Sequence, residues 1–314
     1  MTPVLDGVFN IDKAGGLTSM DVVRRVKRIF SQRRVGHGGT LDPMATGVLP
    51  VCMGQATRLM DYLVNGQKEY LATVRLGVTT DTYDAEGRTV EERDPSGVSR
   101  DDVEAALEQF RGTIQQTPPM YSALKRQGRR LHELARAGVQ VELEPRTVEI
   151  MTLDMVDWQP PLVSLSIRCS RGMYVRSLAY DLGQALGCGA HLAELRRLQT
   201  GPFHADTAVT LERLEEAYQE DTWPSLFYPP DYLVLHLNAV QLSDVEERQV
   251  RNGQPVPLAP RTHYSEHMET CRAYSADGRF IALVRFNRPQ SLWQPFKVLE
   301  LKEPSPYSLE KALT

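Results

Sequence analysis

The chain has 314 residues, of which 41% are hydrophobic and 24% are charged, with a formal net charge of −4. This length suggests about two domains, and the composition excludes a chain that is disordered throughout. No apolar run approaches the roughly 20 residues of a membrane span, the N-terminus lacks a signal-peptide pattern, and the four cysteines have no metal-binding spacing, so we expect a cytoplasmic protein with no membrane association.

Positive charge is concentrated in two segments, although the whole chain is slightly acidic. Six arginines and lysines and no acidic residue lie between Asp21 and Asp42. Residues 125–136 contain five basic residues and one acidic residue. Either segment alone is typical of a solvated helix face, whereas two of them in an acidic chain favour a polyanionic ligand.

The N-terminal part of the chain predicts a helix, a glycine-rich loop and a strand. The sequence from Thr18 to Asp21 has the pattern of a capping box, and apolar residues at helical spacing follow it up to residue 30. Residues 35–47 are rich in glycine, and the short apolar run 48–53 comes directly after them. Alternating apolar and polar residues over 69–76 predict a strand.

The middle of the chain predicts a further helix and then a strand that leads into another helix. Residues 81–87 are rich in turn formers, and residues 101–110 have helical spacing. The clearest alternation covers residues 163–169, which predicts a strand. A helix is expected over 173–186, with Gly187 ending it.

The composition changes near residues 221–231, which are rich in proline and aromatic residues and are interpreted as a linker. Beyond this segment, short apolar stretches such as 280–286 and 296–301 predict a small domain built of strands. The sequence contains no internal repeat and no low-complexity tract.

Residues 36–43, with the sequence GHGGTLDP, carry the most chemical information. Three glycines allow the backbone to approach a ligand closely, and Pro43 restricts the conformation of Asp42. The segment is not a phosphate-binding loop, because no Gly-Lys-Ser/Thr follows, and one His with one Asp does not form a metal site. Taken singly, Asp42 is most simply explained as a cap and His37 as a structural histidine.

Short segments between residues 7 and 203 resemble, in the same order, the motifs of one enzyme family. They are GVFNIDK (7–13), VGHGGTLDPMATGVLP (35–50), KEY (68–70), LGVTTDTYDAEG (76–87), QTPPMYSALK (116–125), CSRGMYVR (169–176), GCGAHLAELRR (187–197) and GPF (201–203). The family is the TruB family of bacterial tRNA pseudouridine-55 synthases. Residues 233–302 are similar to a PUA-type RNA-binding module.

The resemblance implies an α/β (α+β) pseudouridine synthase fold with a central mixed, mainly antiparallel sheet. It places the catalytic domain in residues 1–232, with an RNA-binding insertion at about 113–147. A small β-rich, PUA-like domain is expected over 233–302, followed by a tail over 303–314.

The implied reaction converts uridine 55 in the TΨC loop of tRNA to pseudouridine, after the base has been flipped out of its stack. The glycosidic bond breaks, the uracil turns, and its C5 atom bonds to C1′. Attack of an aspartate on C1′ and loss of a C2′ proton through a glycal both remain open. C5 of uracil is itself nucleophilic, so no cofactor and no metal are expected. A role in assisting tRNA folding is compatible with the resemblance.

Matched motif by motif, the resemblance also implies roles for individual residues. Asp42 corresponds to the catalytic aspartate, which is ionised at neutral pH if its pKa stays near the ordinary value of about 3.9. Arg176 corresponds to the arginine that pairs with it, and Tyr174 to a tyrosine that contacts the substrate. Tyr70 corresponds to the aromatic residue that stacks on the flipped base, although its periodicity alone indicates a core tyrosine on a strand.

Three further positions are expected to contact the substrate or its binding loop. Leu195 corresponds to an apolar wall of the uracil pocket, although its own spacing favours the core of a helix. His37 corresponds to the residue that inserts into the T-loop and holds it open. Lys13 is expected to support the glycine-rich loop or to bind a phosphate.

The chain departs from the usual family pattern at four positions, namely Ala14, Gly38, His132 and Met173. The first two are expected to alter loop rigidity or RNA contacts, and none of the four replaces the catalytic aspartate.

Two alternative functions come from other classes. One is a non-catalytic RNA-binding or RNA-folding protein that keeps the scaffold. The other is a glycosidase or nucleobase hydrolase, which needs a second carboxylate placed to activate water. The sequence identifies no such pair. The expected partner is the T-arm of tRNA, clamped by residues 125–136, and we expect a monomer with no protein partner.

Overall fold

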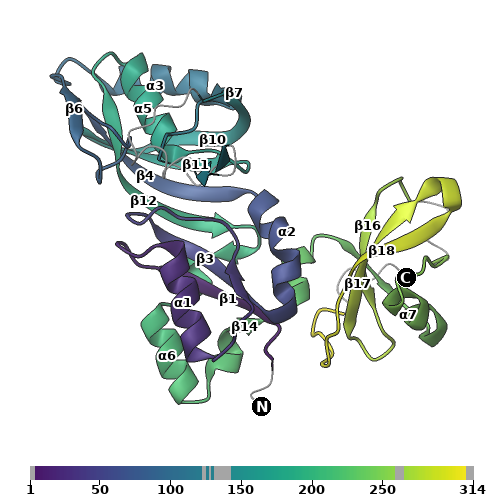
Figure 1. Cartoon of the computed structure of the whole chain (residues 1–314). Coiled ribbons are helices and arrows are strands. Elements are labelled where there is room, and N and C mark those ends of the chain that lie inside the picture. The colour runs from purple at the N-terminus through teal and green to yellow at the C-terminus, as the bar shows by residue number, and fades with distance from the viewer. Residues whose placement is uncertain (1–3, 122–124, 127–128, 131–142, 259–264, 309–314) are drawn as a thin grey trace.

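A computed structural model describes residues 4–121, 125–126, 129–130, 143–258 and 265–308. His132 and most of the basic segment 125–136 lie outside the described residues. The described chain forms a large mixed α/β body and a smaller unit built on a separate sheet (Figure 1).

The body is organised around a ten-stranded sheet with the main strand order β14-β1-β3-β12-β4-β11-β10-β7. Its strands are β1 (Gly7–Lys13), β2 (Val35–His37), β3 (Thr46–Met53), β4 (Lys68–Leu76), β7 (Gly112–Gln116), β10 (Arg146–Gln159), β11 (Leu162–Cys169), β12 (Ala190–Thr200), β13 (Phe203–His204) and β14 (Phe227–Tyr228). Among the described strand pairs of this sheet, only β12 and β3 run in parallel. The predicted mixed, mainly antiparallel sheet is therefore confirmed.

Helices and short two-stranded ribbons complete the described chain. The α-helices are α1 (Ser19–Ile29), α2 (Met60–Asn65), α3 (Arg100–Leu107), α5 (Val175–Ala185), α6 (Leu211–Gln219) and α7 (Asp244–Arg251). The 3₁₀ helices are η1 (Gly54–Leu59), η2 (Glu108–Phe110), η3 (Ala205–Thr207), η4 (Trp223–Leu226), η5 (Pro230–Val234) and η7 (Arg288–Gln290). The ribbons pair β5 (Val78–Thr80) with β6 (Thr89–Glu92), and β8 (Lys125–Arg126) with β9 (Arg129–Arg130).

Most of the predicted elements are present near their expected bounds. The capping box forms at Thr18, whose side chain accepts a hydrogen bond from the Asp21 amide, and α1 follows it. The strand predicted over 163–169 is β11, and the helix predicted over 173–186 is α5. The helix predicted over 101–110 ends earlier as an α-helix, because its last turn tightens into η2.

Part of the predicted glycine-rich loop is a strand. Residues 35–37 form β2, which pairs with β3 through His37 and Val51. The loop proper therefore begins at Gly38 and ends where β3 begins at Thr46.

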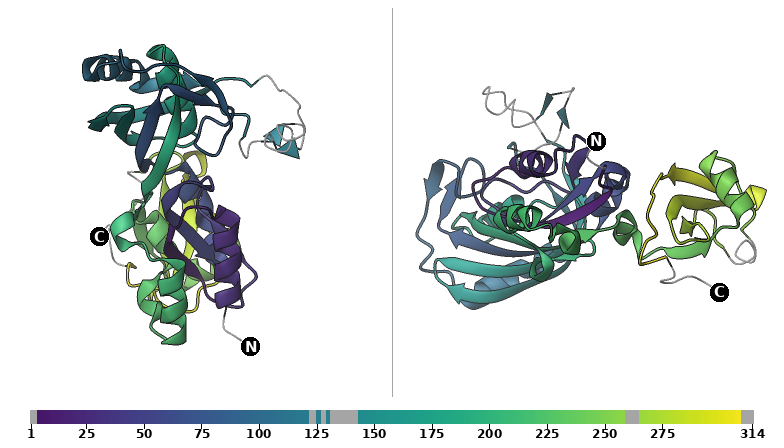
Figure 2. Two further views of the ribbon diagram at one scale, coloured as in Figure 1. Left: turned by 90° about the vertical axis from the view of Figure 1, so that its left-hand side faces the viewer. Right: turned by 90° about the horizontal axis from the view of Figure 1, so that it is seen from below.

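The β8–β9 ribbon stands clear of the body (Figure 2). The chain leaves the main sheet at the end of β7 and returns to the same edge at β10, because Gln116 pairs directly with Arg146. Residues 113–116 and 146–147, which the expected insertion included, thus belong to the main sheet.

A four-stranded sheet forms the small β-rich unit, as predicted. Its order is β15 (Asn238–Gln241), β16 (Thr270–Tyr274), β17 (Phe280–Asn287) and β18 (Leu292–Val298). The strand expected over 296–301 ends earlier, because the chain leaves the sheet after Val298 and Glu300 hydrogen-bonds Gln55 of the body.

The segment 221–231, interpreted from sequence as a linker, is built into the body. It contains η4 and β14, and β14 extends the main sheet by pairing with β1. The ring of Phe227 packs against the ring of Phe9, with their centroids 4.7 Å apart. A second buried cluster joins the two sheets and includes Val8, Val48, Leu59, Tyr274, Phe280, Leu283 and Leu299.

Candidate active site

One cavity of about 570 Å³ brings together five of the residues singled out from sequence. They are Asp42, Tyr70, Tyr174, Arg176 and Leu195. They come from the loop before β3, from strands β4 and β12, and from the start of α5, which are far apart in the chain. The fold thus assembles most of the predicted site.

Asp42 and Arg176 form an ion pair at this cavity. The Arg176 Nε atom lies 2.9 Å from Asp42 Oδ2, and Nη2 donates a hydrogen bond to Oδ1 at 3.1 Å. The arginine side chain is 5% exposed, whereas the aspartate side chain is 33% exposed. The arginine therefore holds the carboxylate from the protein side and leaves part of it open to the cavity.

Asp84 holds the opposite side of the same guanidinium. Its Oδ2 atom accepts a hydrogen bond from Arg176 Nη1 at 3.2 Å, and its Oδ1 atom accepts one from the Thr82 hydroxyl at 2.6 Å. Asp84 is buried, and Nη2 of the arginine also donates to the Tyr121 carbonyl at 2.8 Å. Sequence reasoning assigned no role to Asp84, although it lies in the turn-rich segment 81–87 and in the family-like motif over 76–87.

The charge of Asp42 is set by two opposing effects. Burial raises the pKa of this carboxyl above its ordinary value, and the Arg176 guanidinium lowers it. Asp84 and Lys13 add smaller contributions of opposite sign. The net effect is a raised pKa. Keeping Asp42 ionised in the folded protein therefore lowers the free energy of unfolding.

Tyr70 and Leu195 lie on neighbouring strands of the sheet that forms the cavity floor. On these paired strands Tyr70 is opposite Arg197 and Leu195 is opposite Ala72. Both Tyr70 and Leu195 are buried. The spacing of Leu195 favoured a helix, and that interpretation is wrong, because the backbone of β12 pairs with β4 on one side and β3 on the other.

Two of the cationic side chains that line the cavity are themselves buried, and sequence reasoning missed both of them. Arg197 is fully buried and donates to the carbonyls of Val48 and Gly39 at 2.7 and 3.0 Å. Lys68 donates to the carbonyls of Val64 and Gly66 at 2.9 and 2.7 Å, and burial lowers its pKa to about 8. Arg197 thereby ties β3 to the glycine-rich loop, and Lys68 holds the end of α2 and the residue after it.

Tyr174 is the N-cap residue of α5, immediately before the turn that carries Arg176. Its backbone is bracketed by the Gln116 side chain, which accepts from the Tyr174 amide at 2.8 Å and donates to its carbonyl at 3.0 Å. This pair of hydrogen bonds ties the start of α5 to the end of β7.

Lys13 lies under the glycine-rich loop and is not among the described residues that line the cavity. Its buried ammonium donates to the carbonyls of Ala14, Leu17 and Pro43 at 2.9, 2.6 and 3.0 Å. Burial lowers its pKa to about 8. Its position beside Pro43 fits the expected support of the loop.

His37 is also not among the described cavity-lining residues, and it is half-buried on β2. Burial and the nearby Arg197 guanidinium lower the pKa of its imidazole. The ring is therefore neutral at physiological pH.

Two of the three glycines expected to approach a ligand instead make room for α2. A Cβ atom on Gly36 would lie 2.8 Å from the Met60 sulfur, and one on Gly38 would lie 2.4 Å from Leu63 Cδ1. The third, Gly39, lines the cavity, and its φ of +123° is a conformation that favours glycine. The departure at Gly38 thus has a packing reason.

Part of the basic segment near residues 24–34 is neutralised within the protein. Arg24 pairs with Asp21 at 2.8 Å, and Arg25 reaches Glu212 and Glu215 of α6 at 2.7 Å. These contacts weaken the argument that this segment binds a polyanion.

The described residues contain no group of three or more His, Cys, Asp or Glu side chains placed to hold a metal ion. Among the helices that the structure describes, none is long and apolar enough to cross a membrane.

Two family models together match residues 27–250 of the chain. Residues 27–175 match the family described as TruB family pseudouridylate synthase (N terminal domain), and residues 176–250 match the tRNA pseudouridylate synthase B C-terminal domain. The chain belongs to the TruB family of pseudouridylate synthases. Family membership makes it an isomerase and confirms the resemblance found in the sequence.

Individual relatives extend the TruB likeness across the chain. The chain is 43% identical over 294 residues to tRNA pseudouridine synthase B of Dehalococcoides mccartyi, covering 94% of this chain and 96% of the relative. It is 45% identical over 284 residues to the protein of the same name from Pseudomonas aeruginosa, covering 89% and 91%. Among solved structures, an H/ACA RNP bound to a substrate RNA containing 2′-deoxyuridine matches with a TM-score of 0.69 at 25% identity, covering 96% of this chain and 86% of that one.

Proposed function

We propose that this protein isomerises uridine 55 in the TΨC loop of tRNA to pseudouridine, with Asp42 acting at the ribose. The observation that carries the proposal is the Asp42–Arg176 pair, which points a half-open carboxylate into a cavity floored by Tyr70 and Leu195. Relatives at 43–45% identity are named tRNA pseudouridine synthase B. The proposal places the protein in the cytoplasm as a monomer acting on the T-arm.

Both possible routes need a negatively charged group beside the ribose, and the Asp42 carboxylate supplies it. In one route it attacks C1′ as the bond to N1 breaks, and it leaves C1′ again when C5 attacks that atom. In the other it removes the C2′ proton as the bond to N1 breaks, and it returns this proton to C2′ when C5 bonds to C1′. The uracil then turns, C5 bonds to C1′, C5 loses its proton and N1 gains one, so the atoms balance. Both routes use the same carboxylate, aimed by the two-pronged contact from Arg176.

The cavity floor supports the base while it turns. Tyr70 presents an aromatic ring for stacking, and Leu195 on the adjacent strand provides an apolar wall. Tyr174 borders the same space from the start of α5. Stacking on such surfaces offsets the few kcal/mol needed to flip a base out of its loop.

Residues outside the cavity are proposed to hold the RNA. A neutral imidazole at His37 is suited to inserting among bases of the T-loop, because it has no charge to desolvate. Residues 125–136 are proposed to clamp the T-arm backbone through their positive charge, and residues 233–302 to extend the contact as a PUA-like module. Assistance in tRNA folding is compatible with this arrangement.

The position of Asp84 argues against the alternative of a hydrolase that activates water. It is a second carboxylate close to Asp42, but it is buried and bound to Arg176 and Thr82. A general base must reach a water molecule in the substrate cavity, and these contacts direct Asp84 away from that role. The intact ion pair at Asp42 also argues against a scaffold that only binds RNA.

Release of tritium from a tRNA transcript containing [5-³H]uridine tests the proposal, because only loss of the C5 proton releases the label. We expect release from a complete tRNA and from an isolated T-arm hairpin, with the modified position mapped to uridine 55. Asp42→Asn serves as the control and should release none. Absence of release by the unaltered protein, or modification at another position, would overturn the assignment.

A further inference from the structure

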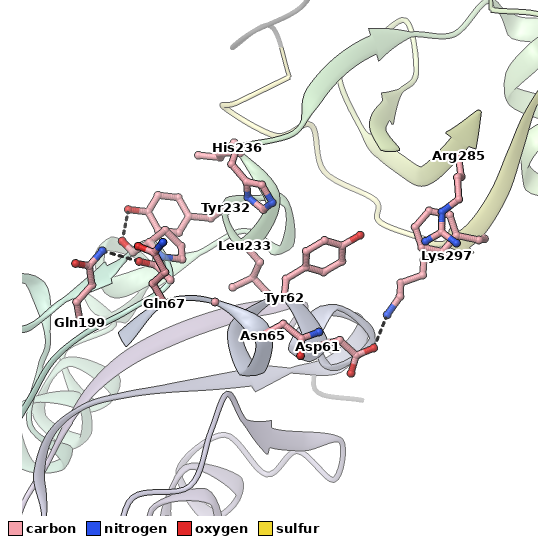
Figure 3. Close-up of a pocket in the computed structure, with 15 residues that line it drawn as sticks. Asp61, Tyr62, Asn65, Gln67, Gln199, Tyr232, Leu233, His236, Arg285 and Lys297 are labelled. Atoms are coloured by element: carbon pink, nitrogen blue, oxygen red, sulfur yellow. Dashed lines mark hydrogen bonds and ion pairs between the residues drawn. The ribbon is translucent and has the colours of Figure 1, made fainter. Parts of the chain in front are cut away.

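A second large pocket lies where the body meets the small β-rich unit (Figure 3). Its volume is about 840 Å³, and its walls come from α2, from η5 and the chain after it, and from β17 and β18. Asn65 lines both this junction pocket and the Asp42 cavity, so the two are neighbours. The proposed reaction makes no use of the junction pocket.

Aromatic faces line the junction pocket from both sides. Figure 3 shows Tyr62 on α2 and His236 after η5 facing the same space, and their ring centroids are 6.0 Å apart at an interplanar angle of 53°. Tyr62 is half-buried and His236 is exposed. Rings held in this way offer stacking surfaces that accept any base.

The charges at the pocket are mainly positive. The Arg285 guanidinium lies over the Phe296 ring, 4.2 Å from its centroid, and no carboxylate pairs with it among the described residues. Lys297 lies 3.1 Å from the carboxylate of Asp61, an acidic group that also lines the pocket. Arg285 is close enough to Tyr62 to oppose the rise in the pKa of its phenol that burial causes.

Amide side chains complete the lining on the side toward the body. Asn65, Gln67 and Gln199 provide donors and acceptors, and Gln199 donates to the Gly201 carbonyl at 2.9 Å. Amides next to aromatic rings and a cation match the three parts of a nucleotide, namely the base edge, the base face and the phosphate.

We propose that the junction pocket binds an unpaired nucleotide of the RNA that carries the target uridine. Its base stacks on Tyr62, and its phosphate contacts Arg285. The inference rests on the proposed function, since it takes the RNA substrate as the ligand. The shared wall at Asn65 lets one RNA strand reach both cavities.

Affinity for a complete tRNA transcript, measured against salt concentration in the Asp42→Asn background, tests the proposal. Tyr62→Leu should weaken binding about fivefold or more, since stacking on one aromatic side chain contributes at least that much. Tyr62→Phe keeps the ring and should bind like the parent. Arg285→Gln should weaken binding and lower the slope of log affinity against log salt by about 0.7.

Asp61→Asn should change the affinity for tRNA in the opposite direction. It removes the carboxylate that pairs with Lys297 at the pocket, so tRNA should bind more tightly. This ion pair is largely exposed on the aspartate side, so its removal should leave the unfolding midpoint unchanged. Arg288→Gln changes an exposed arginine on η7 that does not line the pocket, and this matched control should leave affinity and slope unchanged.

Turnover separates failure of this inference from failure of the proposed function. Tyr62→Leu and Arg285→Gln in the active protein should keep the rate at saturating tRNA, because neither residue lines the Asp42 cavity. Unchanged affinity in both variants, with normal pseudouridine formation by the unaltered protein, would overturn the junction-pocket proposal alone. A protein that neither binds nor modifies tRNA would overturn both.

Discussion

Asp42 and Arg176 are 134 residues apart in the chain, and the Arg176 Nε atom lies 2.9 Å from Asp42 Oδ2. Arg176 in turn contacts Asp84 at 3.2 Å, so two carboxylates share one buried guanidinium. The outer carboxylate faces the cavity and the inner one is enclosed. This arrangement fixes the proposed reactive carboxylate from behind without covering it.

Replacing Asp42 should separate chemistry from recognition. Asp42→Asn keeps the size of the side chain but removes the negative charge, so we expect no detectable pseudouridine. Affinity for tRNA should be retained, because phosphate contacts and the opened loop supply most of it. Single-turnover kinetics with binding measured in parallel provides the check, and normal turnover by this variant would refute the role of Asp42.

The same variant should be more stable than the unaltered protein at neutral pH. Burial raises the pKa of Asp42 in the folded state. At pH values between the ordinary pKa and this raised pKa, the folded protein therefore binds more protons than the unfolded chain. Its free energy of unfolding therefore falls as pH rises through that window. Asparagine avoids this cost, so urea unfolding should show a stability difference at neutral pH that shrinks as pH is lowered toward about 4. A constant difference across this range would contradict the assigned pKa shift.

Arg176 variants should turn over more slowly the less firmly they hold Asp42. Arg176→Lys keeps the charge but loses the planar fork, and a misplaced reacting group can cost on the order of 100-fold in rate. Arg176→Ala should be slower still, and its activity should require a higher pH, because the pKa of Asp42 rises further without the guanidinium. Rates measured across pH at saturating tRNA test both expectations, and a Lys variant with the full rate would rule out the two-pronged contact as important.

Asp84 should act as a positioning residue for Arg176. Asp84→Asn removes one of the two carboxylate charges that hold the guanidinium, and we expect turnover to fall by roughly 10- to 100-fold while the KM for tRNA changes little. Asp81→Asn is a matched control in the same turn, since Asp81 pairs with the exposed Arg88 instead. Equal rates in the two variants would show that Asp84 has no effect on the reaction.

Local sequence patterns were sufficient for α1, β4 and β11, because each has a repeating apolar face or a cap within a few residues. They were not sufficient for Leu195 and Asp84. Leu195 lies on a strand whose two neighbours are distant in the chain, and that pairing overrides its helical spacing. The importance of Asp84 depends on a guanidinium 92 residues away, which no local pattern reveals.

The basic segment offers a test of how the T-arm is held. Four of its positions should be changed to Gln together: Lys125, Arg126, Arg129 and Arg130. We expect the dependence of log affinity on log salt to flatten by up to about 0.7 for each single-strand phosphate that the variant no longer binds. The rate at saturating tRNA should change less than the affinity. An unchanged salt dependence would show that this segment is an ordinary solvated surface that does not bind the RNA.

Removing the small β-rich unit should destabilise the body as well. Tyr274, Phe280, Leu283 and Leu299 share a buried cluster with Val8, Val48 and Leu59 of the body. Ending the chain after residue 232 would expose the body side of this cluster and also interrupt η5, which spans Pro230–Val234. Re-exposing a large apolar side chain costs about 1.5–3 kcal/mol, so we expect a clearly lower unfolding midpoint.

A second truncation, after Leu237, keeps η5 and isolates the effect of removing the sheet. It should be more stable than the shorter form, because Leu233 and Val234 remain in place to cover part of the exposed cluster. The proposed catalytic residues all precede the cut, so the fraction that stays folded should still modify an isolated T-arm hairpin. Thermal unfolding of both truncated forms beside the full chain, with hairpin turnover at a temperature where each is folded, makes the comparison. Midpoints equal to that of the full chain would mean that the shared cluster does not couple the two units.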